Sequence, residues 1–175
     1  MSQQPDPPLS AMDSRLATAV VVARLRAGRS TSLRVSGRSM YPFLAPGQDV
    51  LLEPCATEAL RPGELVAFER AGRVILHRVL SVHPGTGQVI EKGDNVRQAS
   101  LVEKNEILGR ATALVGRRPV ELTQSRYIRV GRWLAGMSAV HARLHRFASE
   151  HRLIGRPLAL GFTVVIRLAG ALAKV

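Results

Sequence analysis

The sequence predicts a mainly β protein, in which a β domain lies between a short N-terminal helix and appended C-terminal helices. Through the middle of the chain, apolar residues alternate with a period of two, which is typical of strands. Turn-forming Pro and Gly residues separate these runs. After Pro119 the apolar spacing changes to that of a helix. Hydrophobic residues make up 46% of the chain and charged residues 22%, which indicates a globular rather than a disordered protein.

The chain begins with a polar segment, residues 1–12, which we expect to be a disordered leader. This segment contains three prolines and lacks the basic start and apolar run of a secretory signal. We therefore expect no cleavable export signal and a cytoplasmic location.

A short helix is predicted after the leader. Asp13 or Ser14 can cap its N-terminus, and Gly28 can end it after about Ala27. Arginines interrupt this helix and it is shorter than the roughly 20 apolar residues that cross a bilayer, so it is not a membrane span. Its apolar spacing predicts one buried face, formed by Leu16, Val20 and Leu25.

Strands are predicted wherever the alternation holds, and turn residues stand between them. The Ala71-Gly72 pair supplies the backbone angles of a tight reversal, so we expect the strands on either side of it to form a hairpin. Together with the first helix, these strands give a single domain over residues 13–118. The predicted strands are Leu33 with Val35, Val50–Glu53, Leu65–Glu69, Val74–Val82, Gln88–Glu91 and Ile107–Val115.

Residues 119–175 are predicted to form a basic, amphipathic helical region. After Arg110 the chain holds 11 Lys or Arg residues and 2 Asp or Glu residues. Helices are expected over Tyr127–Phe147 and over Leu158–Ala173, the second being too short to span a bilayer. Trp133 among arginines predicts that residues 127–175 bind an anionic membrane surface, on the inner face of the cell membrane. The alternative is that the first helix packs on the β domain with its arginines in water.

The segment Val35-Ser36-Gly37-Arg38-Ser39-Met40-Tyr41-Pro42 carries the densest signal of a catalytic function. A nucleophilic serine needs a tight backbone that projects its hydroxyl while neighbouring N–H groups converge on the developing oxyanion. Gly37 would let the backbone approach closely without a Cβ. We therefore assign Ser39 as the candidate nucleophile, and Gly37, Arg38 and Met40 as candidates for substrate and oxyanion contacts. The alternative is an ordinary serine in a surface turn.

A serine hydroxyl is unreactive without a base, and an imidazole is the side chain best suited to accept its proton near pH 7. Strand alternation places His77 on one face with Ile75 and Val79, opposite Arg78. Asp94, in a turn at a strand end, is the candidate that would orient this imidazole. The alternatives are a core histidine bonded to a backbone carbonyl, and a turn aspartate bonded to a nearby backbone N–H.

Three segments together resemble the serine signal peptidases. The first is Gly-x-Ser-Met-x-Pro, which contains Ser39. The second is His-Arg-Val, whose His77 follows Ser39 by 38 residues, and the third is Lys-Gly-Asp-Asn, whose Asp94 follows His77 by 17 residues. Leu108-Gly109-Arg110 comes after them. The similarity covers roughly Leu33 to Val115. It is strongest to the endoplasmic-reticulum and archaeal branch, which has a histidine where the bacterial enzymes and the self-cleaving SOS repressors have a lysine. The resemblance implies a mostly antiparallel, coiled β fold, a substrate bound as an extended strand, and an oxyanion hole that uses the Ser39 backbone N–H.

We therefore predict a serine endopeptidase that cleaves leader or signal-like peptides through an acyl-enzyme, with Ser39, His77 and Asp94 at its centre. The histidine branch carries a further aspartate after Gly-Asp-Asn, whereas Val96–Ser100 contains none, so a Ser/His dyad steadied by Ser100 is an alternative. Two other functions stay open: a peptide-binding protein on a degenerate peptidase scaffold, and a self-cleaving regulator.

Metal ions, cofactors and nucleic acids are not expected. Cys55 is the single cysteine, and no Cys/His pair stands at zinc-ligand spacing. The positive charge follows the β domain, whereas a repressor of this kind would carry its DNA-binding domain before it, and no helix-turn-helix is recognisable.

Overall fold

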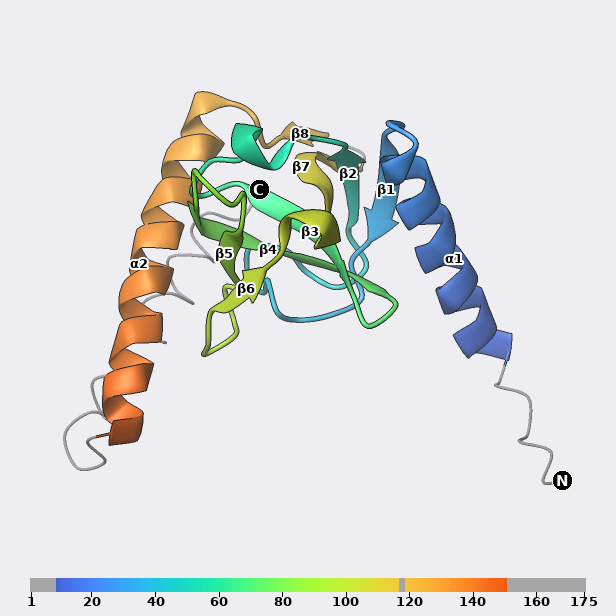
Figure 1. The fold of residues 1–175 in the computed structure, drawn as a ribbon. Helices are drawn as coiled ribbons and strands as arrows, with labels where there is room; N and C mark the ends of the chain where they lie inside the picture. The colour runs from blue at the N-terminus through green and yellow to red at the C-terminus, as the bar shows by residue number, and fades with distance from the viewer. Residues whose placement is uncertain (1–8, 117–118, 151–175) are drawn as a thin grey trace, which may run out of the picture.

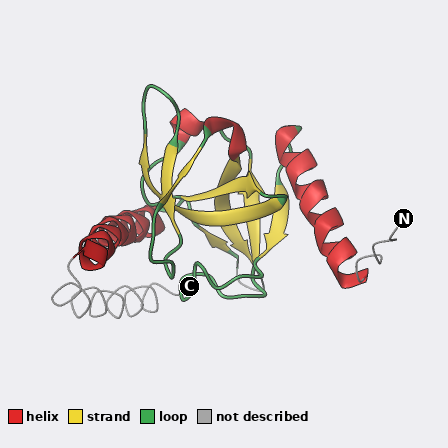
Figure 2. Ribbon diagram, turned by 60° about the horizontal axis from the view of Figure 1, so that its bottom comes forward, coloured by secondary structure: helices red, strands yellow, loops and turns green. Residues whose placement is uncertain are grey.

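The computed structural model describes residues 9–116 and 119–150, and it confirms the mainly β fold (Figure 1). Its strands form one antiparallel sheet in the order β1-β2-β7-β3-β4-β5-β6, with β8 paired to β7. Two helices, α1 (Leu9–Arg26) and α2 (Ser125–Glu150), flank the twisted strands on different sides (Figure 2). The strands are β1 (Thr31–Arg34), β2 (Asp49–Glu53), β3 (Leu65–Arg70), β4 (Arg73–Val82), β5 (Val89–Lys92), β6 (Ser100–Val102), β7 (Ile107–Val115) and β8 (Val120–Glu121).

The alternation located the longer strands, β2, β3, β4 and β7, to within a residue of their ends. Strands β6 and β8 were not predicted, because three and two residues are too few to show a period. They are strands because β5 and β7 offer them backbone partners. Since β8 pairs with β7, the sheet extends past residue 118, where the sequence analysis ended the domain.

The β3–β4 hairpin forms as predicted and divides the interior into two hydrophobic clusters. Ala71 (φ 50°) and Gly72 (φ 68°) occupy its tight turn, with left-handed backbone at both positions as a type I′ turn requires. One face of the hairpin contributes to a cluster with β5 and β6; its buried members are Leu60, Val66, Phe68, Val79, Val89 and Val102. The other face, through Leu65, Ala67 and Leu76, joins a larger cluster that includes residues of α1, β2, β7 and α2.

Helix α1 ends as expected but begins earlier. Gly28 adopts φ 73°, its N–H donates to the Leu25 carbonyl at 3.1 Å, and the Arg29 N–H donates to the Arg24 carbonyl at 2.9 Å, which together form a Schellman motif. The start at Leu9 corrects both the cap at Asp13 or Ser14 and the leader over residues 1–12, of which residues 1–8 lie outside the described part. No proline follows Pro8 in this region, so nothing in residues 9–12 interrupts a helix.

The predicted buried face of α1 was wrong in two of its three residues. Leu25 is buried, but Leu16 is 68% exposed and Val20 is 49% exposed. Val21 is buried in the larger cluster instead. The reason is tertiary: the helix runs past the edge of the β domain, so its earlier turns have no sheet to cover them (Figure 1).

Helix α2 begins two residues before the predicted Tyr127 and packs one face on the β domain. Leu134 is fully buried in the larger cluster, and burial of such a side chain contributes about 1.5–3 kcal/mol. The backbones of Gly131 and Gly63 touch, since a Cβ added at Gly131 would lie 2.5 Å from the Gly63 carbonyl oxygen. Yet Trp133, next to Leu134, is 53% exposed. Packing on the domain and an exposed aromatic face are therefore both present in this helix.

The predicted second C-terminal helix, Leu158–Ala173, lies outside the described residues. Within residues 9–116 and 119–150, neither helix combines the length and the apolar character that crossing a bilayer needs.

Candidate active site

Ser39 lies in a tight loop that continues directly from β1. Val35 still exchanges hydrogen bonds with the chain entering β2, and the loop then turns, with the Tyr41 N–H donating to the Arg38 carbonyl at 3.1 Å. Met40 is only 2% exposed and sits in the larger hydrophobic cluster, whereas Ser39 is half-buried. The buried Met40 thus anchors the loop and leaves Ser39 at the surface of the domain.

The three predicted neighbours of the nucleophile occupy different environments. The side chain of Met40 points into the core, so only its backbone can belong to the site. Arg38 and Gly37 are exposed. The close backbone approach expected at Gly37 is not seen, because a Cβ at this position would meet no atom within 4 Å. The loop is at the surface here, where no other part of the described chain crowds it.

The segment after β5 joins the Ser39 loop to the β4–β5 strands. The Asn95 N–H donates to the Ser39 carbonyl at 2.7 Å, and the Asn95 side-chain amide donates to the Arg38 carbonyl at 3.2 Å. A Cβ on Gly93 would lie 2.8 Å from the Ser39 carbonyl oxygen and 2.9 Å from Nε2 of His77. Glycine is therefore required at this position, and Nε2 of His77 lies on the side of the imidazole that faces the Ser39 loop.

His77 lies on the predicted face of β4, with Ile75 and Val79. Its ring packs edge-on against Phe68, with the ring centroids 6.0 Å apart. Its other nitrogen, Nδ1, is 2.5 Å from Oε2 of Glu91. The imidazole side chain is 14% exposed and the Glu91 side chain 3% exposed, so this contact is largely shielded from water.

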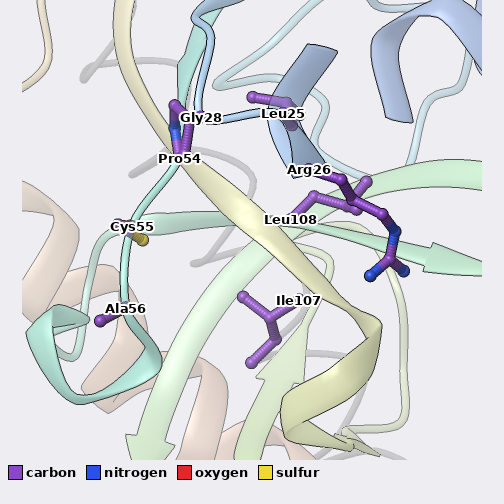
Figure 3. A pocket seen from close by; sticks show the side chains of 8 residues that line it. All are labelled: Leu25, Arg26, Gly28, Pro54, Cys55, Ala56, Ile107 and Leu108. Carbon is purple, nitrogen blue, oxygen red and sulfur yellow. The ribbon is translucent and has the colours of Figure 1, made fainter. Parts of the chain in front are cut away.

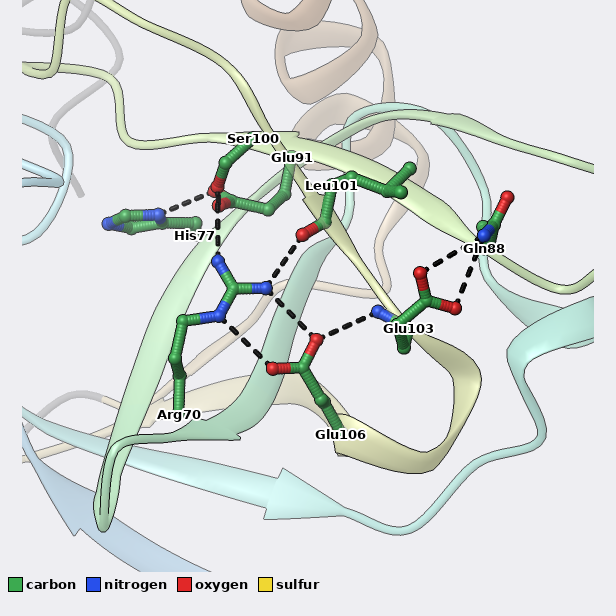
Figure 4. Close-up of polar contacts among 8 residues, drawn as sticks. All are labelled: Arg70, His77, Gln88, Glu91, Ser100, Leu101, Glu103 and Glu106. Carbon is green, nitrogen blue, oxygen red and sulfur yellow. Dashed lines mark hydrogen bonds and ion pairs between the residues drawn. The ribbon is translucent and has the colours of Figure 1, made fainter.

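Glu91, which the sequence analysis did not select, therefore holds the place expected for Asp94 (Figure 4). Val79 of β4 pairs with Glu91 of β5, and His77 shares a face with Val79, so the carboxylate reaches diagonally to the imidazole. The Ser100 hydroxyl donates to the other oxygen of Glu91. The sequence does show a carboxylate, Glu91, in the next predicted strand. Predicting that it contacts His77 would have required the pairing register of the two strands.

The prediction that Asp94 orients His77 is corrected by the geometry. Both oxygens of Asp94 accept from Arg78, at 2.8 Å from Nε and 2.7 Å from an Nη, and the two side chains are 2% and 1% exposed. Another Nη of Arg78 donates to the Gly63 carbonyl at 2.8 Å. The Arg78 guanidinium also lies 4.7 Å from the ring centre of Phe43. Asp94 thus neutralises a buried arginine on the face of β4 opposite His77.

Lys92 is buried beside this ion pair. Burial lowers the pKa of its ammonium from the ordinary 10.5 to about 8, with Arg78 acting in the same direction and Asp94 and Glu91 opposing it. Its Nζ donates to the Gly93 carbonyl at 3.2 Å. Lys92 pairs across the strands with Arg78 and not with His77. Its side chain is fully buried, so it belongs to the interior of the domain.

An open pocket of about 470 Å³ lies away from these residues, between the end of α1 and strands β2 and β7 (Figure 3). It holds neither Ser39 nor His77. Burial raises the pKa of the Cys55 thiol within it, which makes this cysteine less reactive. The pocket is lined by Leu25, Arg26, Gly28, Pro54, Cys55, Ala56, Ile107 and Leu108.

No group of three or more His, Cys, Asp or Glu side chains among the described residues could hold a metal ion. Comparisons of the chain with protein-family models, with curated proteins and with solved structures give no match.

Proposed function

We propose that this chain is a serine endopeptidase in which Ser39 is the nucleophile, His77 the general base and Glu91 the group that orients the base. The observation that carries the proposal is the position of the imidazole. Its Nδ1 is held by a buried carboxylate at 2.5 Å, and its Nε2 faces the loop that carries Ser39. A base held in one tautomer beside a serine is what acyl transfer to a hydroxyl requires.

In the proposed reaction, Oγ of Ser39 attacks the scissile carbonyl of a peptide and His77 Nε2 takes the hydroxyl proton. The C–N bond then breaks as His77 returns this proton to the leaving amine, which leaves an acyl-Ser39. Water next attacks the ester with the same base, and the carboxylic acid departs with Ser39 regenerated. Glu91 accepts the Nδ1 proton in a hydrogen bond throughout, which keeps the lone pair of Nε2 directed to Ser39.

The resemblance to the serine signal peptidases supports a leader or signal-like peptide, bound as an extended strand, as the substrate. The Ser39 backbone N–H is the proposed first donor to the oxyanion. The exposed positions of Gly37 and Arg38, directly before the nucleophile, leave room for a peptide on that side of the loop.

A fluorophosphonate probe tests this proposal without knowledge of the substrate. Wild-type protein should be labelled at Ser39, as mapped by mass spectrometry, and both Ser39→Ala and His77→Ala should lose labelling, because hydroxyl and base act as one unit. Ser36→Ala, in an exposed position of the same loop, and His83→Ala, in an exposed turn, are the matched controls and should label normally. Normal labelling of His77→Ala would exclude His77 as the base.

We also propose an anionic membrane surface, on the inner face of the cell membrane, as a second partner. Trp133 is 53% exposed, and Arg129, Arg132 and Arg143 are exposed on the same helix. The sequence of α2 contains no acidic residue before Glu150. An exposed aromatic residue among cations suits the boundary between anionic headgroups and lipid tails.

A further inference from the structure

The polar contacts of the site continue beyond Glu91 to Ser100 and Arg70 (Figure 4). Ser100, at the start of β6, donates its hydroxyl proton to Oε1 of Glu91. Arg70, at the end of β3, donates from one Nη to the Ser100 hydroxyl oxygen at 3.4 Å. A continuous series of contacts therefore runs from the guanidinium through a hydroxyl and a carboxylate to the imidazole.

With Glu91 ionised, the donors in this series have one consistent arrangement. A guanidinium donates and never accepts, so the oxygen of Ser100 must accept from Arg70. The single hydroxyl proton of Ser100 is then directed to Glu91. With one oxygen bound to Ser100, the other oxygen of Glu91 faces Nδ1 of His77. The contacts thus hold the rotation of the carboxylate, and its free oxygen, an acceptor, favours a neutral His77 with the proton on Nδ1.

Arg70 is itself held firmly. Two of its nitrogens donate to the carboxylate of Glu106, at 3.1 and 3.0 Å, and one donates to the Leu101 carbonyl at 2.6 Å. The Glu106 carboxylate raises the pKa of the guanidinium and Glu91 adds to the effect. The guanidinium also lies 5.2 Å from the ring centre of Phe68, the ring on which His77 packs. A side chain with this many partners has few alternative rotamers, so it gives Ser100 a stable neighbour.

We propose that Ser100 and Arg70 are positioning residues of the peptidase site, which act on His77 through Glu91. This inference rests on the proposed function, because a general base can accept the Ser39 proton only in the correct tautomer. Ser100 stands in the stretch after Gly-Asp-Asn where the histidine-type signal peptidases carry a further aspartate. In this chain the carboxylate comes from Glu91 on β5, and Ser100 binds it from β6.

The competing explanation is that Arg70 and Ser100 only join β3 to β6. A variant series separates the two roles. Ser100→Ala removes the hydroxyl, Ser100→Thr retains one, and Arg26→Ala removes another arginine that contacts a carboxylate and a backbone carbonyl without touching Glu91. For each variant the limiting rate and the half-saturation concentration of fluorophosphonate labelling are measured, together with the thermal unfolding midpoint.

A positioning role predicts that Ser100→Ala lowers the limiting labelling rate about 10- to 100-fold without changing half-saturation, because a small displacement of the reacting groups costs this much. Ser100→Thr should restore most of the rate, and Arg26→Ala should not change it. An equal loss in Ser100→Ala and Ser100→Thr, or a wild-type rate in Ser100→Ala, would overturn the inference.

A second measurement does not need enzymatic activity. The ¹⁵N shifts of the His77 ring, assigned with His77→Ala, report which nitrogen carries the proton. Wild type should show the proton on Nδ1, and Ser100→Ala and Arg70→Met should show a mixture of tautomers. Unchanged ¹⁵N shifts in both variants would overturn the inference. If wild-type protein is not labelled at Ser39, the proposed function fails, and these spectra alone decide whether Ser100 and Arg70 position His77.

Discussion

The two faces of the β4–β5 pair each carry a contact between a basic side chain and a carboxylate. The two contacts span similar distances in sequence but differ in burial and in chemistry. His77 and Arg78 are neighbours on β4, and each contacts a carboxylate of the β5 segment, Glu91 or Asp94. The Arg78 and Asp94 side chains are 1% and 2% exposed, while the His77 side chain is 14% exposed. The Arg78–Asp94 pair is buried against Phe43 of the larger cluster, whereas the His77–Glu91 pair lies beside Phe68 of the smaller cluster, next to the Ser39 loop.

The β4–β5 pair thus separates a contact that serves stability from one that serves chemistry. A guanidinium does not release its proton, so a buried Arg78 can only be neutralised, and Asp94 serves that purpose. An imidazole exchanges a proton near neutral pH and is useful only where one nitrogen stays accessible. Strand alternation assigns the two roles to opposite faces, so a change on one face should leave the other intact.

The largest effect is expected on the His77 face. Glu91→Gln should lower fluorophosphonate labelling of Ser39 by about ten-thousand-fold, since an amide in place of the orienting carboxylate favours the wrong tautomer. The unfolding midpoint in urea should change little by comparison. Glu69→Gln, in a partly exposed ion pair with Arg26, is the control and should label at the wild-type rate. Full labelling of Glu91→Gln would remove Glu91 from the site.

The next effect is expected on the Arg78 face and concerns stability. Asp94→Asn leaves the Arg78 charge buried without its partner, which should lower the free energy of unfolding by about 3–5 kcal/mol in urea titrations. Asp49→Asn breaks a solvent-exposed pair with Arg34, which water screens, and should lower the free energy of unfolding far less. Under conditions where Asp94→Asn is still folded, Ser39 should label normally. A stable Asp94→Asn that fails to label would return Asp94 to the catalytic machinery.

Lys92 gives the Arg78 face a dependence on pH. Its pKa is about 8 in the folded protein and 10.5 ordinarily, so between these values the unfolded chain binds more protons. Stability should therefore rise with pH over this window, by roughly 3 kcal/mol, and the cost of the buried charge is fully present below pH 8. Urea unfolding of wild type and of Lys92→Met at pH 7 and pH 10 gives the change in the free energy of unfolding for each protein. The change should be larger in wild type, by the contribution of Lys92. Parallel pH curves for the two proteins would contradict it.

The smallest effect lies outside both faces, on α2. Each basic residue near an anionic lipid surface contributes about 1 kcal/mol, so Arg129→Ala and Arg132→Ala should each release the protein from anionic vesicles at lower salt in sedimentation assays. Trp133→Ala should weaken binding as well, while Arg73→Ala, at the exposed hairpin turn, should not. Truncation near Pro119 is a poorer test than point variants, because it would remove Leu134 from the core. Equal sedimentation with neutral and anionic vesicles would contradict the proposal.

Near-neighbour sequence was sufficient for the longer strands β2, β3, β4 and β7, for the turn between β3 and β4, and for the two faces of β4. Alternation over ten residues was enough to place His77 with Val79 and opposite Arg78, and Ala71-Gly72 was enough to predict the hairpin. Gly28 was enough to predict the end of α1. These features depend on contacts between near neighbours, or on backbone angles that few residues adopt, and a sequence states both directly.

The choice of carboxylate at the imidazole depends on contacts between strands. Glu91 and Asp94 are three residues apart, and either could reach back from a strand end. The pairing of Val79 with Glu91, next to a register shift between Val79 and Ser81, places Glu91 on the His77 face. Asp94 lies past the end of β5, in a turn, where its carboxylate contacts Arg78 on the other face. The exposure of Leu16 and Val20 was likewise decided by how far the sheet extends under α1. The register of paired strands, and the part of a helix that a sheet covers, both depend on residues distant in sequence. The periodicity of one segment does not contain that information.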